Sequence, residues 1–185
     1  MYKLILCRKE DEEVTKEVFE WIKTIAISVI IALLITTFIA RPTLVKQESM
    51  YPTLYENDYL ILDKLSYRFQ KPERGDIVVF EAALITADGD NKDLIKRVIG
   101  LEGDHVVVRD GRTYINDEEL KEDYINGSYK RGNVDLVVPE DKVFVMGDNR
   151  EISYDSRDIG PIDIQTIRGK VLVRLYPFNR IGKVD

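Results

Sequence analysis

The sequence predicts a mainly β fold, in which an antiparallel β-sheet domain follows one N-terminal transmembrane helix. Three observations predict it: an uncharged apolar run at residues 24–40, many short strand-like runs after it, and no long amphipathic helix beyond residue 41. We therefore expect a short cytoplasmic segment (1–18), a transmembrane helix (19–40) and an extracytoplasmic β-rich domain (41–185).

The apolar run "TIAISVIIALLITTFIA" is 17 residues long, bounded by Lys23 and Arg41. At roughly 1.5 Å per residue it reaches about 25 Å, near the lower limit for crossing a bilayer core. Phe19, Trp21 and Ile22 extend its apolar face. A buried core helix is the alternative, but such a helix normally carries a polar stripe. A cleavable signal peptide fits less well, because the preceding segment is long and acidic.

Basic residues near the ends of a span set its orientation. Five precede it and two follow it before residue 60: Lys3, Arg8, Lys9, Lys16 and Lys23 against Arg41 and Lys46. This asymmetry predicts a single-pass membrane protein with its N-terminus in the cytoplasm and its β domain outside.

The region after the span consists of short runs rich in Val, Ile, Leu, Phe and Tyr, bounded by Gly, Asp, Asn and Pro. This composition is typical of strands separated by turns. The clearest runs are "DYLILDKL", "GDIVVFEAAL", "DLIKRVIGL", "DHVVVRDGRTYIND", "DKVFVMGD" and "GKVLVRLYPF". Asp110-Gly111 divides the fourth run and predicts a tight hairpin turn.

The overall charge and the scarcity of Cys and His exclude several classes of function. The 185 residues carry 27 Lys plus Arg and 33 Asp plus Glu, a net charge of −6, which argues against nucleic-acid binding. One cysteine, Cys7, permits no intramolecular disulfide. With a single histidine besides, a Cys/His metal site lacks ligands, so we expect no metal and no cofactor.

A candidate nucleophile, Ser49, lies in "KQESMYPTL", nine residues past the apolar run. An extended chain of that length spans at most roughly 30 Å, so Ser49 would work near the membrane surface. Pro52 favours an extended conformation at Tyr51, which suits a rigidly held side chain. A lone loop serine is usually unremarkable, so the assignment depends on a base elsewhere in the chain.

Two residues compete for the role of base. His105 heads a hairpin strand, where a histidine is usually structural. Lys96 in "DLIKRVIG" is the better candidate, because a buried lysine can lose its proton whereas its neighbour Arg97 cannot. Lowering a lysine pKa from about 10.4 to about 8 costs roughly 3 kcal/mol. Alternation along the strand does not say which of Lys96 and Arg97 is buried.

The third candidate stretch, residues 146–162, reads "MGDNREISYDSRDIGPI" and follows an apolar strand. A structural loop would explain its Gly, Asp and Asn content. Its paired opposite charges instead favour an ordered polar network, in which a hydroxyl orients the lysine and an Asp–Arg pair holds the loop.

These stretches together resemble bacterial type I signal peptidases, the membrane-anchored serine proteases that remove signal peptides from exported proteins. "SMYPTL", "RGDIVVF", "KRVIGLEGD" and "GDNREISYDSRDIGPI" match the family's conserved boxes in the family's order, behind a single span. The short stretch between Lys96 and Gly147 is similar to the compact Gram-positive enzymes. The resemblance implies a β-sheet catalytic domain on the outer membrane surface that cuts after small residues.

The resemblance also implies roles for individual residues. Ser49 matches the nucleophile, Lys96 the general base, and Ser153 a serine that hydrogen-bonds the lysine. Asp155 with Arg157 matches a buttressing pair. The backbone amide of Ser49 belongs to the oxyanion hole, and Met50, Leu54 and Ile95 border the substrate pockets. The expected partners are signal peptides of preproteins and the lipid bilayer, with the enzyme acting as a monomer.

The sequence departs from the family pattern at two positions. Gln47 stands where a small residue is common, and its side chain either donates to the oxyanion or points away. Glu102 stands where proline is frequent, and nothing in the sequence explains this change. Two rivals remain: a soluble self-cleaving regulator of the SOS-repressor type, which would carry a DNA-binding head in place of the span, and an inactive membrane-anchored binding module, which would be expected to lose Ser49 or Lys96.

Overall fold

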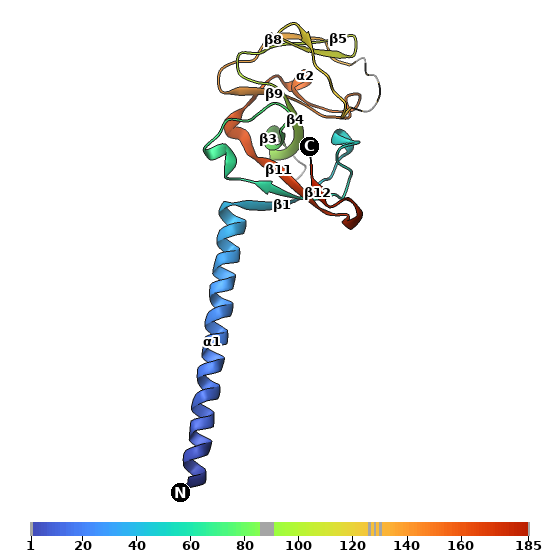
Figure 1. Cartoon of the computed structure of the whole chain (residues 1–185). Helices are drawn as coiled ribbons and strands as arrows, with labels where there is room; N and C mark the ends of the chain where they lie inside the picture. The colour runs from blue at the N-terminus through green and yellow to red at the C-terminus, as the bar shows by residue number, and fades with distance from the viewer. Residues whose placement is uncertain (1, 86–90, 126, 128, 130, 185) are drawn as a thin grey trace. The chain divides into compact units, whose positions relative to one another are not determined.

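The computed structural model describes residues 2–85, 91–125, 127, 129 and 131–184, and it divides into two units, 1–39 and 40–185. The first unit is the helix α1 (Tyr2–Phe38), which begins well before residue 19 and ends two residues before residue 40 (Figure 1). Within the described residues, no helix has an apolar stretch long enough to cross a membrane. The side chains of Lys3, Arg8 and Lys9, used to predict orientation, lie outside the described part.

The second unit confirms the predicted antiparallel β domain, because every strand pair among its described residues is antiparallel. The larger sheet has the spatial order β1 (Ala40–Leu44), β2 (Tyr59–Asp63), β11 (Ile167–Tyr176), β3 (Ile77–Ile85), β4 (Asn91–Gly100), β9 (Lys142–Met146) and β10 (Ile162–Asp163), with β12 (Gly182–Lys183) paired to β11. The smaller sheet has the order β7 (Glu118–Glu119), β6 (Arg112–Ile115), β5 (His105–Arg109) and β8 (Val134–Val137).

The strongest strand signals in the sequence correspond to real strands. All six predicted runs contain strands, and Asp110-Gly111 forms a two-residue turn between β5 and β6. Both turn residues have positive φ, 50° and 75°, as the turn type that matches strand twist requires. Helices in this unit are short: α2 (Ser156–Ile159) and the 3₁₀ turns η1 (Glu48–Met50), η2 (Ser66–Arg68), η3 (Ile164–Thr166) and η4 (Phe178–Arg180).

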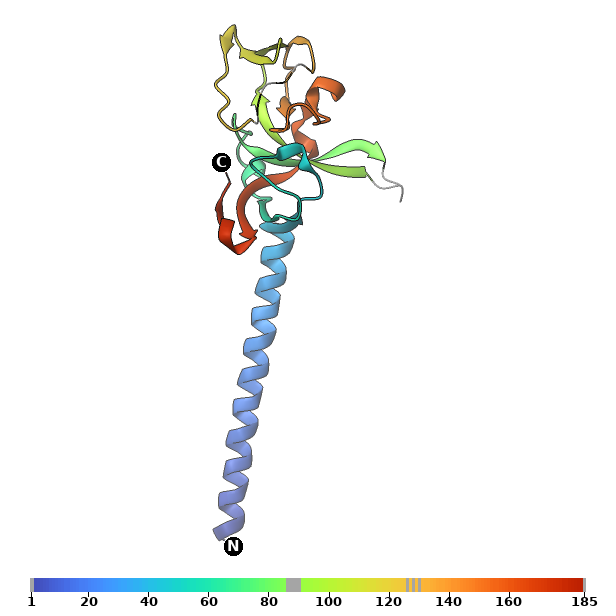
Figure 2. The ribbon, with the colours of Figure 1, turned by 90° about the vertical axis from the view of Figure 1, so that its right-hand side faces the viewer.

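Strand β4 lies between β3 and β9 inside the larger sheet, and β3 and β4 form a long ribbon that projects from it (Figure 2). Hydrophobic clusters cover both faces of β4. Val98 packs in a cluster with Val78 and Phe80, and Ile99 packs in another with Val106 of the smaller sheet. Residues 96–99, which alternate between the two faces of β4, are therefore removed from water. This burial bears directly on Lys96 and Arg97.

Candidate active site

Ser49 lies in the middle of η1 and is half-buried. The next residue, Met50, is buried in a hydrophobic cluster together with Leu54, whose amide donates to the Met50 carbonyl at 2.8 Å. Tyr51, before Pro52, is extended (φ −65°, ψ 137°), as the sequence predicts. The serine thus projects from a short turn that is anchored in the hydrophobic core through Met50.

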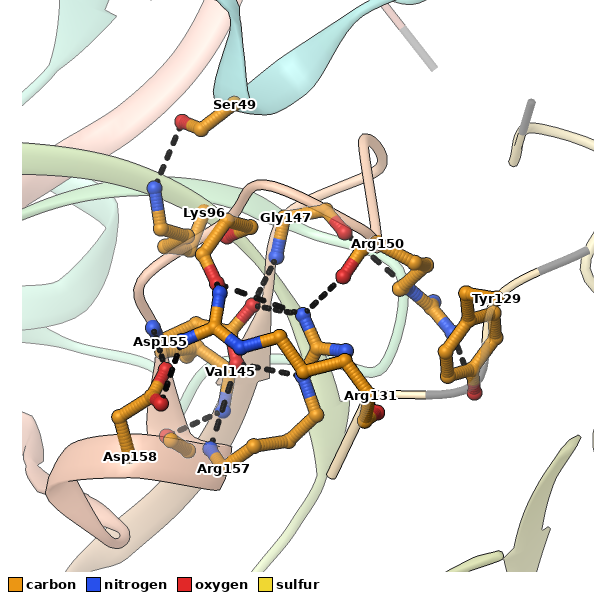
Figure 3. Close-up of polar contacts among 12 residues, drawn as sticks. Ser49, Lys96, Tyr129, Arg131, Val145, Gly147, Arg150, Asp155, Arg157 and Asp158 are labelled. Carbon is orange, nitrogen blue, oxygen red and sulfur yellow. Dashed lines mark hydrogen bonds and ion pairs between the residues drawn. The ribbon is translucent and has the colours of Figure 1, made fainter. Parts of the chain in front are cut away.

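The side chain of Lys96 reaches from β4 to this turn (Figure 3). Its Nζ donates to Ser49 Oγ at 2.7 Å and to the Ile95 carbonyl at 3.0 Å. Lys96 is 1% exposed and Arg97, on the opposite face of the strand, is 2% exposed. Strand alternation could not say which of the two is buried, and the structure shows that both are.

Burial lowers the pKa of Lys96 from its ordinary value of 10.5 to about 8. Desolvation of the ammonium is the main cause, because a low-dielectric site disfavours the charged form. The carboxylate of Asp155 acts in the opposite direction, and the charge of Lys92 adds to the lowering. A lysine in this state loses its proton within reach of physiological pH.

The loop after β9 surrounds Lys96 and is organised by Asp155 (Figure 3). Asp155 caps α2 and forms a bidentate pair with Arg157, whose Nε and Nη2 each donate at 2.9 Å. The amide of Gly147 donates to the same carboxylate at 3.0 Å. Burial alone would raise the pKa of Asp155, but these hydrogen bonds and the Arg157 charge hold it below 3.8. The loop therefore rests on a buried, ionised pair.

Ser153, which the resemblance places on Lys96, is fully buried. Its hydroxyl does not meet the distance and angle limits of a hydrogen bond to any described residue, but it lies close enough to the Asp155 carboxylate to help lower the pKa of that group. Lys96 bonds Ser49 and a backbone carbonyl instead. Ser153 lies against Gly147, where an added Cβ would come within 2.3 Å of its Oγ. Arg131 holds the Ser153 carbonyl at 2.9 Å. The serine is thus fixed in place, with its hydroxyl beside the Asp155 carboxylate and not bonded to Lys96.

A second buried ion pair, missed in the sequence, joins the segments that carry the site. Arg97 donates to both carboxylate oxygens of Asp148, at 2.9 and 2.7 Å, and Thr53 donates to the same carboxylate at 2.5 Å. Strand β4, the loop after β9 and the nucleophile segment therefore meet at one carboxylate. The available signal was Arg97 itself, because an arginine among apolar strand residues needs a buried anion.

A comparable network ties the site loop to the smaller sheet. Arg150 is almost completely buried and forms an ion pair with Glu122, and it also contacts Thr113 and Tyr129. Arg150 Nη1 lies 2.7 Å from Glu122. No sequence pattern pointed to Glu122, which lies between β7 and β8.

Ser49 lies between two cavities. The larger, of about 730 Å³, includes Met50 and Ile95 in its wall, and the smaller, of about 590 Å³, includes Lys96 and Tyr154. Gln47 is exposed and lines both. Leu54, expected at the pocket, lies instead in the core behind Met50 and lines neither cavity.

His105 lies outside the site. It is on β5, where its Nε2 is 2.8 Å from Asp135 of β8. The described residues contain no group of three or more His, Cys, Asp or Glu side chains placed to hold a metal ion. The groups gathered around Ser49 suit acyl transfer, with a hydroxyl nucleophile and an amine of lowered pKa in hydrogen-bond contact.

Comparison with known proteins decides the family. The sequence model of "Signal peptidase, peptidase S26" matches residues 18–176. The chain belongs to the signal peptidase family, peptidase S26. Signal peptidase I of Leptolyngbya laminosa is 46% identical over 170 residues, 89% of this chain and 83% of that one. Signal peptidase I S of Bacillus subtilis strain 168 is 36% identical over 190 residues, covering 96% and 100%.

Among solved structures, a signal peptidase I from Enterococcus faecalis V583 matches 55% of this chain and 97% of its own, with 34% identity and a TM-score of 0.46. Membership in the signal peptidase family confirms the enzyme class predicted from the sequence boxes, a protease and hydrolase of the signal peptidase I type.

Proposed function

We propose that this signal peptidase is a membrane-anchored serine endopeptidase that removes N-terminal signal peptides from exported preproteins, cutting after small residues by a Ser49–Lys96 dyad. The observation that supports the dyad most directly is the 2.7 Å hydrogen bond from Lys96 Nζ to Ser49 Oγ. The lowered pKa of Lys96, about 8, supports its role as the base.

The chemistry follows from these two side chains. Neutral Lys96 accepts the Ser49 hydroxyl proton while Oγ attacks the scissile carbonyl carbon. The tetrahedral oxyanion is stabilised by the Ser49 backbone amide, with Gln47 placed at the cavity wall as a second possible donor. Collapse expels the amine, which takes the proton from the Lys96 ammonium and leaves the signal peptide as a Ser49 ester. Lys96 then deprotonates a water molecule that hydrolyses the ester.

Ser153, Asp155 and Arg157 act by positioning in this proposal. Proton transfer requires that the Lys96 amine point in one direction. The buried Ser153 hydroxyl, beside Asp155, would hydrogen-bond that amine when Ser49 is acylated. The Asp155–Arg157 pair holds the loop that carries Ser153. The wall formed by Met50 and Ile95 would receive the residue before the cut, with Leu54 supporting Met50 from the core.

The anchor in this proposal is the apolar part of α1, within residues 19–40. Its described large apolar side chains are exposed around the helix, as a lipid-facing helix requires: Phe19, Trp21, Ile22, Ile25, Ile27, Val29, Ile30, Ile31, Leu33, Leu34 and Phe38. Residues 1–18 would lie in the cytoplasm and 41–185 at the outer surface, with the enzyme working as a monomer against the bilayer. Substrate and enzyme would then meet within one thin layer.

The test is cleavage of a purified preprotein by the full-length chain. The parent should release the mature protein, and Ser49→Ala, Lys96→Ala and Lys96→Arg should not, because arginine stays protonated. Lys121→Gln, an exposed lysine outside both cavities, is the matched control and should cleave like the parent. An inactive parent would favour the alternative of a binding module, and turnover by Lys96→Arg would disprove the dyad.

A further inference from the structure

The two cavities beside Ser49 share part of their wall. Lys46, Gln47, Ser49, Lys92 and Leu94 line both. If the proposed function holds, the larger cavity receives the substrate on the N-terminal side of the cut, because Met50 and Ile95 lie there. The smaller cavity then receives the residues that follow the cut. Lys46 and Lys92 lie in the shared wall, between the part of the substrate before the cut and the part after it.

Lys92 belongs to the same strand face as the proposed base. Residues 92, 94 and 96 alternate along β4, so their side chains point to one side of the sheet, and all three line the smaller cavity. Lys92 is half-buried and Lys46 is exposed. Neither ammonium has an ion pair or hydrogen bond to another residue in the described part of the chain.

The charges on the two cavity walls differ. In the larger cavity Arg41 lies 3.9 Å from Asp93, so that pair is balanced and Lys46 and Lys92 remain in excess. In the smaller cavity Glu48 and Glu56 face the same two lysines. With Lys96 neutral in the active enzyme, the wall on that side is balanced. Counted over the described residues that line them, the larger cavity therefore carries more positive charge than the smaller one.

We propose that Lys46 and Lys92 form a cationic rim that selects substrates with an acidic side chain among the second to fourth residues before the scissile bond. Neither ammonium forms an ion pair with a described residue, and a carboxylate entering the larger cavity would supply a partner. A basic side chain there would meet two like charges. After the cut, where Glu48 and Glu56 balance the lysines, charge would matter little.

The expected size of the effect is modest, because the rim is partly solvated. An exposed ion pair contributes little, so the two lysines together should favour Asp over Lys by only about 5- to 10-fold in kcat/KM. Added salt screens such pairs, since the Debye length falls from about 10 Å at 0.1 M to about 3 Å at 1 M. The preference should therefore shrink as salt is raised.

Lys92 should act in a second way that Lys46 does not share. The charges that act on Lys96 are Asp155, Asp148, Arg157 and Lys92, and Lys92 is among those that lower its pKa. Lys92→Gln should consequently move the rising limb of the pH–rate profile to higher pH. Lys46→Gln should leave that limb in place while still weakening the preference for acidic substrates.

The experiment uses the full-length enzyme and one peptide series with Asp, Asn or Lys at the second, third or fourth position before the cut, and a second series varied at the two positions after it. The parent should prefer Asp to Lys by at least about 5-fold at one upstream position and by less than about 2-fold downstream. Lys46→Gln with Lys92→Gln should abolish the upstream preference. Lys121→Gln should retain it.

Binding of the same peptides to Ser49→Ala, followed by fluorescence anisotropy, separates this proposal from the catalytic one. If the parent cuts the neutral Asn peptides and neither cleavage nor binding distinguishes Asp from Lys upstream, the rim is disproved while the proposed function stands. If the parent cuts none of the peptides, the proposed function fails, and a charge preference in binding would still support the rim. An upstream preference that survives the double substitution would also overturn the proposal.

Discussion

Lys96 Nζ lies 2.7 Å from Ser49 Oγ, although 47 residues separate the two in the chain. Buried neighbouring residues fix the positions of both side chains. Ser49 sits on a turn whose Met50 is buried in the core, and Lys96 sits on a strand that is covered on both faces. The carboxylate of Asp148 ties the two segments together through Thr53 and Arg97. Contact between the proposed nucleophile and base therefore follows from buried packing and a buried ion pair.

Ser153→Ala should lower kcat more than it changes KM, by about 10- to 100-fold, because it removes a group that directs the amine. Its unfolding free energy should change by no more than about 1 kcal/mol, since the Ser153 hydroxyl makes at most one poorly aligned contact, with the Asp155 carboxylate, within the described structure. Steady-state kinetics and thermal melts measure the two quantities. Equal kcat for the variant and the parent would show that Ser153 does not orient Lys96.

Asp155→Ala should destabilise the protein by about 3–5 kcal/mol, because it leaves Arg157 as an uncompensated buried charge. Glu81→Ala, which breaks a partly exposed pair with Arg168, is the control and should cost no more than about 1 kcal/mol. Urea unfolding compares the two. Similar losses for both variants would contradict a structural role for the Asp155–Arg157 pair.

The same pair makes stability depend on pH. The folded pKa of Asp155 lies below its ordinary value of 3.8, so its contribution is fully present above that value and is lost as pH falls through the folded pKa. The parent should therefore lose stability in acid below about pH 4 more steeply than Asp155→Ala does. Parallel acid titrations of the two proteins would contradict this.

Substrates with Ala immediately before the cut should be cleaved far better than those with Leu or Phe. The wall formed by Met50 and Ile95 excludes larger groups by steric overlap, and the core behind Met50 is too well packed to yield. Cleavage rates of a preprotein series with these three residues measure the effect. Efficient cleavage after Leu or Phe would refute a small pocket.

Deletion of residues 1–39 should leave a folded enzyme that still cuts soluble peptides, because residues 40–185 form a compact unit with its own core. It should lose efficiency on preproteins embedded in vesicles, where the proposed anchor confines enzyme and substrate to one layer. Equal rates on vesicle-bound preprotein with and without the helix would show that anchoring contributes nothing.

Strands with a marked composition could be predicted from sequence, and weakly patterned ones could not. Strands β2, β3, β4, β9 and β11 are rich in Val, Ile, Leu and Phe and were found by that signal. Strand β1 reads "ARPTL" at the sheet edge, and β8 reads "VDLV" with its residues half-buried or exposed. Such strands form because a neighbour offers hydrogen bonds, a tertiary effect that composition does not record.

The candidate site, too, could be predicted from the sequence only in part. The chemistry of serine and lysine, together with the family boxes, led to Ser49 and Lys96, but strand alternation could not show that Arg97 is buried as well. Alternation assumes one solvated face, and residues 96–99 of β4 have none. The position of Leu54 behind the pocket, and the absence of a bond from the Ser153 hydroxyl to Lys96, depend on how short turns close, which is likewise set by packing.

The most direct test of the Ser49–Lys96 dyad is the pH dependence of kcat/KM, measured with a soluble peptide that has no titrating group near the cut. Because the neutral amine is the active form, kcat/KM should rise with pH and level off, with an apparent pKa near the value of about 8 that burial gives Lys96. A profile that is flat from about pH 6 to 10, or one whose midpoint lies at the ordinary lysine value of about 10.4, would contradict the account.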